Sequence, residues 1–179
     1  MGAFGPGSFE NDDALDFAAE LEASGAAALS EVLERAVGGD GVRDAGLGAA
    51  ALAAAEVVAA LAGRPSGELP DEVKLWVADA GAGAGAGLAA GGVEKLLGLA
   101  RRALAVVTGG DAELAMLPPY GADGHDIAND RAGWDLWGAR ADLFLGRASP
   151  AQVAATAERA DTAQAEMSAA AVLPAGDGR

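Results

Sequence analysis

Apolar residues recur every three to four positions along most of the chain, which is the period of an amphipathic α-helix. The pattern predicts a first helix that begins at Asp12, with Asn11 as its N-cap, and ends near Ser24-Gly25. A second helix follows through residues 29–36 and closes at Gly38-Gly39. No stretch shows the sustained alternation of a β-strand, so the sequence predicts an all-α fold, a bundle of several helices.

Three further helices are expected before residue 110. One runs from about residue 44 to residue 62, and another, of about two turns, has Pro70 at its first helical position. Residues 80–92 alternate glycine with alanine and are predicted to form a flexible insert, because glycine costs about 1 kcal/mol relative to alanine inside a helix. The apolar residues between 93 and 107 then predict the clearest amphipathic helix. In the helix from 44 to 62, one stripe is predicted to face the core: Leu47, Ala51, Ala55, Val58 and Leu61.

The last third of the sequence predicts a polar loop and two helices. The first of these helices carries Trp134 and Trp137, and the second begins at a capping box over residues 149–152. We therefore expect one helical domain over residues 1–148, an added C-terminal helix over 149–173 and a frayed tail over 174–179.

The chain opens with an irregular, glycine-rich arm. Its glycines permit close approach of the backbone, so Phe4 and Phe9 are expected to enter an apolar groove. If the groove belongs to a second copy, the protein is a dimer. If it belongs to the same chain, the arm is a lid over the helix face that carries Glu56.

Charge and composition narrow the classes of function. The chain has 12 basic and 27 acidic residues, a net charge of −15 and a pI near 4.2. Nucleic acids and anionic membranes are recognised through lysine and arginine, so neither is an expected partner. The charge favours a basic partner or cations, although the residue usage of a GC-rich bacterial genome accounts for the same bias.

Features that the sequence lacks indicate where the protein is located. No cysteine occurs, so the chain has neither a disulfide nor a thiolate zinc site, as fits a reducing cytoplasm. The N-terminus lacks the pattern of a secretory signal, and charged residues interrupt both alanine-rich stretches, so no membrane span is expected. The predicted location is the cytoplasm.

The opening residues 2–16, GAFGPGSFENDDALD, resemble the start of a bacterial family described as domain of unknown function 4259. Members typically open with Met-Gly-Ala-Trp-Gly, followed by Phe-(Asp/Glu)-Asn-Asp and a helix; here Phe4 replaces the tryptophan. The resemblance spans roughly residues 1–145 and implies an all-helical intracellular protein. No activity is established for the family, so it carries over no catalytic residue. Other similar stretches are Ala53–Ala60, Leu69–Val77 and Leu99–Leu104.

Four carboxylates form the candidate binding site. Asp12, Asp16 and Glu20 lie four residues apart and stack along one face of the first predicted helix. Glu56 lies in an alanine- and valine-rich run, where desolvation is expected to raise its pKa. Carboxylate oxygens are ligands that Mg²⁺ and Ca²⁺ prefer, so a divalent cation is one interpretation. The other is a capped, solvated helix start, because acidic residues there also stabilise the helix dipole.

A buried Glu56 would need a partner. The candidates are the side chains of Arg35, Arg101 and Arg102, or the backbone amides of the glycine-rich arm.

Three weaker motifs carry little chemistry. Glu31 and Glu34 match half of the acidic signature of helical nucleotide pyrophosphohydrolases, but a second pair is missing. The run over residues 81–90 fits a dinucleotide-binding pattern only because it is periodic, and no βαβ unit surrounds it. The single histidine, His125, could join Asp130 in a metal site, but the sequence pairs it with no candidate nucleophile or second histidine.

The residues therefore favour a protein-interaction or structural and regulatory module, which binds a protein partner or a second copy. No cofactor and no catalytic residue are predicted. The alternative is a metal-dependent hydrolase or small-ligand binder that uses the four carboxylates. Convergence of these carboxylates in one pocket would favour the alternative, whereas their spread over a solvated surface would favour the interaction module.

Overall fold

The computed structural model describes most of the first two thirds of the chain and part of the last third. By its contacts the chain divides into two compact units, Met1–Pro118 and Pro119–Arg179. The ordered elements of the described part are helices and no strand is among them, which confirms the all-α prediction. The described residues are 7–40, 44–67, 69–81, 88, 91–109, 111–112, 139, 149, 151–152, 154–156, 158–159, 162 and 165.

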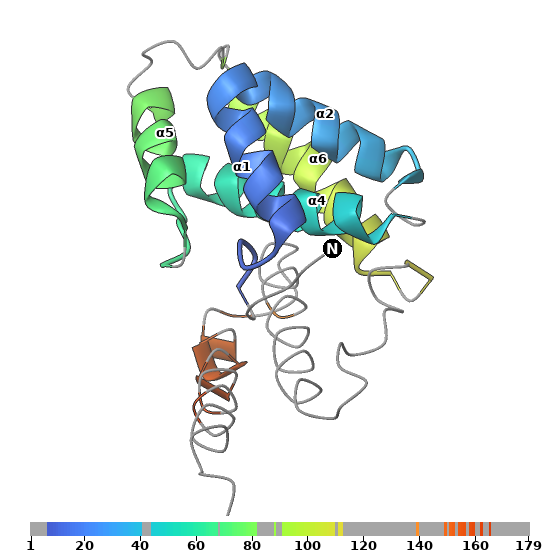
Figure 1. Ribbon diagram of the computed structural model, residues 1–179, viewed down its shortest axis with the longest axis vertical. Coiled ribbons are helices and arrows are strands. Elements are labelled where there is room, and N and C mark those ends of the chain that lie inside the picture. Colours follow the sequence, from blue (N-terminus) through green and yellow to red (C-terminus); the bar gives the residue numbers. More distant parts are fainter. Residues whose placement is uncertain are drawn as a thin grey trace, which may run out of the picture. The chain divides into compact units, whose positions relative to one another are not determined.

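Helices that pack against one another make up the first unit (Figure 1). The helices are α1 (Asp12–Ser24), α2 (Ala26–Val37), α4 (Ala45–Leu61), α5 (Asp71–Gly81) and α6 (Gly92–Val107). Three of them, α1, α4 and α6, begin and end within about two residues of the predicted positions, and α2 ends within two residues of its predicted end but begins three residues before the predicted range.

Short polar side chains and glycine set the helix ends. The side chains of Asn11 and Asp44 each accept a hydrogen bond from the backbone N–H three residues later, at 2.8 and 3.0 Å, and so begin α1 and α4. Gly25 lies between α1 and α2 with a φ of 63°, a conformation that favours glycine. Its N–H donates to the carbonyl of Leu21, so one residue ends α1 and precedes α2.

Helix α5 is longer than predicted. It has 11 residues, about three turns, and takes in Ala80 and Gly81, the first two residues of the predicted insert. Ala80 is buried, so packing stabilises a turn that the glycine content alone did not predict. Pro70 was expected at the first helical position, but it precedes the helix and its carbonyl accepts the N–H of Lys74 at 2.9 Å. Residues 82–87 and 89–90 of the insert lie outside the described residues.

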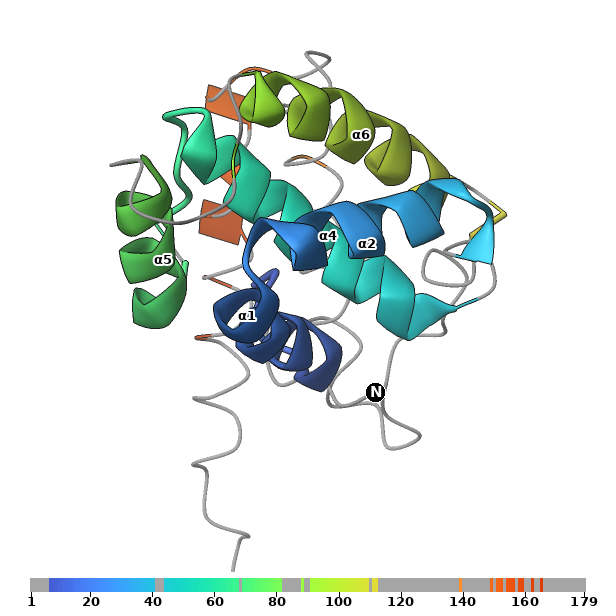
Figure 2. The same ribbon diagram turned by 90° about the horizontal axis from the view of Figure 1, so that it is seen from above.

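Helix α4 is the centre of the first unit. It packs against α1, α2, α5 and α6, and Figures 1 and 2 show these helices arranged around it. Twelve of its 17 residues are buried, most of them alanine. The predicted one-sided stripe was therefore too narrow: Val57 and Ala53 are buried as well, whereas Leu61 is only half-buried.

The outer helices cover different sides of this centre. Helix α1 and helix α6 lie on opposite sides of α2 and α4, as the view in Figure 2 shows. Helix α5 packs on α4 and on α1. The amphipathic face predicted for α6 is confirmed, since Leu96, Ala100, Leu104 and Val107 are buried.

The second unit contains the predicted capping box. The backbone N–H of Ser149 donates to Oε1 of Gln152 at 2.7 Å, and the N–H of Gln152 donates to Oγ of Ser149 at 3.3 Å. Trp134 and Trp137 lie outside the described residues, as do residues 140–148 and 166–179. The predicted domain boundary at 148 and the frayed tail stay predictions.

Helices α1 and α4 approach each other at Gly46. A Cβ added to Gly46 would lie 2.5 Å from Oδ1 of Asp13 and 3.3 Å from Oδ1 of Asp44. At Gly98 in α6, by contrast, an added Cβ would meet only Nη1 of Arg102, at 3.8 Å. A methyl group at Gly46 would therefore force the Asp13 carboxylate to shift, whereas one at Gly98 would displace nothing.

We predict that Gly46→Ala lowers the free energy of unfolding by about 1–2 kcal/mol, because the new methyl group displaces the Asp13 carboxylate. Gly98→Ala should raise it by about 0.5–1 kcal/mol, since alanine favours the helix. Urea unfolding followed by circular dichroism measures both. An equal stabilisation by the two substitutions would contradict the close approach at Gly46.

We predict that Ala54→Leu lowers the free energy of unfolding by about 1–3 kcal/mol, because Ala54 is fully buried in α4 and a larger side chain separates the helices around it. Ala59→Leu, on a half-exposed position of the same helix, should change it by less than about 1 kcal/mol. If both substitutions change the free energy of unfolding equally, the neighbouring helices do not pack closely around α4 at Ala54.

Candidate functional site

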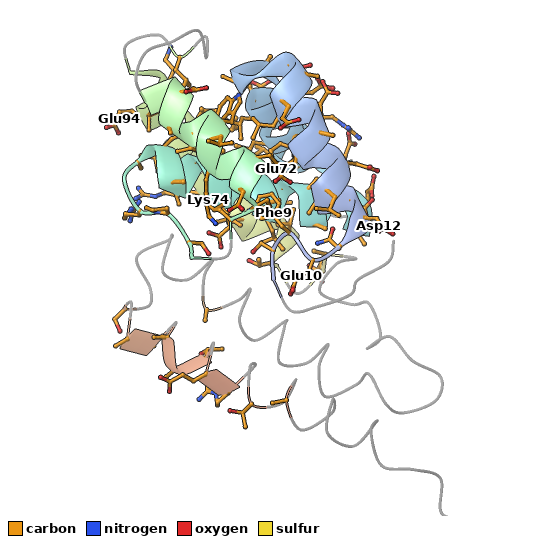
Figure 3. All side chains as sticks on the ribbon, turned by 60° about the vertical axis from the view of Figure 1, so that its left-hand side comes forward. Phe9, Glu10, Asp12, Glu72, Lys74 and Glu94 are labelled. Atoms are coloured by element: carbon orange, nitrogen blue, oxygen red, sulfur yellow. The ribbon has the colours of Figure 1, made fainter. Side chains whose placement is uncertain are left out.

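A tight turn over residues 7–11 leads into α1. The N–H of Gly7 donates to Oε2 of Glu10 at 2.6 Å, and the N–H of Glu10 donates back to the carbonyl of Gly7 at 3.0 Å. Phe9 is buried, and in Figure 3 it lies against the helices while Glu10 points away from them. The described part of the glycine-rich arm therefore packs on its own chain, as expected for a lid. Phe4 lies outside the described residues.

The turn reaches α4 through a polar contact. The hydroxyl of Ser8 donates to Oε1 of Glu56 at 3.5 Å, across 48 positions of the sequence. Ser8 is only 5% exposed, and Glu56 is half-buried. The arm thus supplies a side-chain hydroxyl as one partner for Glu56.

Asn11 joins the turn to α1. It is only 1% exposed; its Oδ1 accepts the N–H of Ala14, and its Nδ2 donates to the carbonyl of Ser8 at 3.4 Å. A buried amide needs partners for both its oxygen and its nitrogen. Asn11 satisfies this need within the motif itself, so the opening motif has a structural role in fixing the turn.

The carboxylate of Asp13 lies between the first turns of two helices. It belongs to the first turn of α1, and its Oδ1 approaches Gly46 in the first turn of α4. The contact distances at Gly46 place the Oδ1 atoms of Asp13 and Asp44 within about 6 Å of each other. The other carboxylate oxygen of Asp13, Oδ2, is buried and has no hydrogen-bond partner. The positive ends of two helix dipoles stabilise a negative charge at this position.

Asp13 was not among the four candidate carboxylates predicted from the sequence. Capping and dipole compensation in α1 accounted for it, and its approach to α4 depends on tertiary packing. The nearest sequence signal is Gly46, a glycine in the first turn of a helix. Glycine is tolerated there whether or not a second helix comes close, so its presence alone does not reveal the contact.

The structure separates the predicted carboxylates into two places. Asp12, Asp16 and Glu20 are exposed on α1, where Glu20 accepts a hydrogen bond from the hydroxyl of Ser24. Glu56 lies on α4, next to the turn. Within the described ranges no group of three or more histidines, cysteines or acidic residues could hold a metal ion. The function of these four residues as a binding site stays a prediction.

The weaker motifs fall on the surface or outside the described part of the chain. Glu31 and Glu34 are exposed on α2. His125 lies outside the described residues.

The solvent-facing side of α1 carries acidic residues and an exposed leucine, and we call it the α1 face. Leu15, at 41% exposure, lies on it as an exposed large hydrophobic residue. Every charged residue of α1 is acidic. The α1 face therefore combines negative charge with an apolar contact. Its members are Asp12, Leu15, Asp16, Ala19, Glu20 and Glu22.

A comparison with protein families gives one match. The sequence model of the family described as "Domain of unknown function (DUF4259)" matches residues 2–117. The match covers nearly all of the first unit, but it is shorter than the predicted resemblance to residue 145. Comparisons with curated proteins and with solved structures give no match. Of the helices in the described part, none is long and apolar enough to cross a membrane.

We predict that Ser8→Ala lowers the free energy of unfolding by about 1–2 kcal/mol, because it removes a donor to a half-buried carboxylate. The matched control is Ser24→Ala, which removes the same type of donor from the exposed Glu20 and should cost less than about 0.5 kcal/mol. Both values come from urea unfolding. Equal losses would mean that the turn does not depend on its contact with Glu56.

Proposed function

The chain belongs to the DUF4259 family, and because a family of unknown function gives no activity to transfer, we propose a function from the surface: a protein-interaction module. The α1 face binds a basic surface of a partner protein. The proposed place of action is the cytoplasm of a bacterium, which the absence of cysteine supports.

One observation carries this proposal: α1 directs an exposed leucine to solvent within a face whose charged residues are all acidic. A single exposed leucine is common on protein surfaces. On the α1 face, however, Leu15 lies three residues from Asp12, on the same side of the helix, so one partner side chain could use apolar burial and charge together.

The spread of the carboxylates supports an interaction role over a metal site. Asp12, Asp16 and Glu20 lie along the exposed side of α1, and Glu56 lies on α4. Three of the four are therefore exposed to solvent.

The proposal can be tested with a defined probe, a synthetic amphipathic helix of lysine and leucine. The full chain is titrated with this peptide at physiological salt, and backbone amide shifts are followed by NMR. We expect the shifts to concentrate on α1. Asp16→Asn with Glu20→Gln should weaken binding on the order of tenfold, since each exposed charge pair contributes up to about 1 kcal/mol.

The matched control carries the same change of charge on another helix. Glu31→Gln with Glu34→Gln also removes two exposed carboxylates, but from α2. This variant should weaken binding by less than about threefold, because screening at physiological salt limits the effect of distant charges. Equal weakening by the two double variants would show that the peptide follows net charge alone, and the proposed α1 face would then be wrong.

A further inference from the structure

Helix α6 presents a surface of the opposite charge. Lys95, Arg101 and Arg102 are exposed on it, together with one acidic residue, Glu94. Arg102 donates to the carbonyl of Gly98 at 3.2 Å, which holds its guanidinium along the helix surface. The exposed side of α6 therefore has a net positive charge, although the whole chain is strongly negative.

Basic and apolar residues alternate along one edge of this surface, which we call the α6 stripe. Its members lie at helical spacings of four, three and four, so they follow one another on the same side. Leu99 and Val106 are half-buried and keep part of their surface open to solvent. The α6 stripe consists of Lys95, Leu99, Arg102 and Val106.

The α1 face contains a stripe with the complementary chemistry. Asp12, Leu15, Ala19 and Glu22 lie at spacings of three, four and three, and all four are exposed. On α1, acidic residues thus flank an apolar centre. On α6, basic residues alternate with apolar ones. Both stripes are about as long as three helical turns.

These two stripes cannot meet within one chain. Helices α2 and α4 lie between α1 and α6, as Figure 2 shows, so the exposed sides of α1 and α6 face away from each other. A contact between the stripes requires two molecules.

We propose that the partner of the α1 face is a second copy of this chain, which binds through its α6 stripe. The inference rests on the proposed function of the α1 face and names its partner. Because the two surfaces differ, the association is head-to-tail, and each copy keeps one free stripe.

The net charge does not prevent this contact. Repulsion between two chains of −15 acts over the whole surface, whereas screening reduces charge interactions beyond about 8 Å at physiological salt. Opposite charges within the contact lie closer than that distance and are screened least. Local complementarity therefore sets the orientation of the two copies.

The test uses charge reversal on each of the two surfaces in the full chain. One variant carries Asp16→Lys and Glu22→Lys on the α1 face, and the other carries Lys95→Glu and Arg102→Glu on the α6 stripe. Sedimentation velocity at physiological salt measures association over a range of concentrations. We expect the wild-type protein to associate as its concentration rises, and each variant alone to associate at least tenfold more weakly.

Mixing the two variants provides the decisive control. In the mixture, the unchanged surface of each variant meets its original complement, and the two reversed surfaces complement each other. Association should therefore return to within about threefold of the wild-type value. Only folded chains can restore it, so a misfolded variant is recognised by its failure here together with a loss of helical circular dichroism. Two folded variants that fail to restore association would overturn the proposal.

The outcomes separate this inference from the proposed function. A wild-type chain that stays monomeric, yet binds the lysine–leucine peptide on α1, overturns the second copy as partner and leaves the interaction module intact. Self-association that persists in the α6 variant but not in the α1 variant has the same meaning. If the α1 variant retains both self-association and peptide binding, the α1 face itself is wrong.

Discussion

The small side chains of α4 are the constraint on which the rest of the first unit depends. Four helices contact α4, and most of its buried residues are alanine, so neighbouring backbones can approach it from several sides. A helix with leucine at these positions would keep its neighbours farther away and could not be shared by all of them. At Gly46 a methyl group would meet the Asp13 carboxylate and force it to shift. The arrangement of α1, α2, α5 and α6 therefore follows from the small size of most side chains on α4.

Local signals account for the helix boundaries that could be predicted from the sequence. Asn11 and Asp44 cap the helices that follow them, and Gly25 separates two helices through its own backbone conformation. Burial on all sides of α4 could not be predicted in this way, because a periodic pattern reveals only a contrast between faces. Alanine fits both a surface and a core, so it provides no such contrast. The extra turn of α5 has the same origin, since the burial of Ala80 depends on its neighbours in space.

The candidate site was predictable only in part, for a related reason. Exposed carboxylates at positions 12, 16 and 20 follow directly from helical spacing. The contact of Ser8 with Glu56 joins residues 48 positions apart, and the approach of Asp13 to Gly46 joins two helices. Neither contact has a local signature. Ser8 and Asp13 both belong to the opening motif, and through these contacts they join the turn and α1 to α4.

The same central helix also accounts for where the charges lie. Helix α4 contains a single charged residue, Glu56, because burying more charge among alanine and valine would require a partner for each. The charged residues of the described part therefore lie mainly on the outer helices, where their distribution is uneven. The charges of α1 are all acidic, whereas basic residues outnumber acidic ones on α6. Because α1 and α6 cover opposite sides of α2 and α4, a core that excludes charge leaves the first unit with surfaces of opposite sign facing in opposite directions.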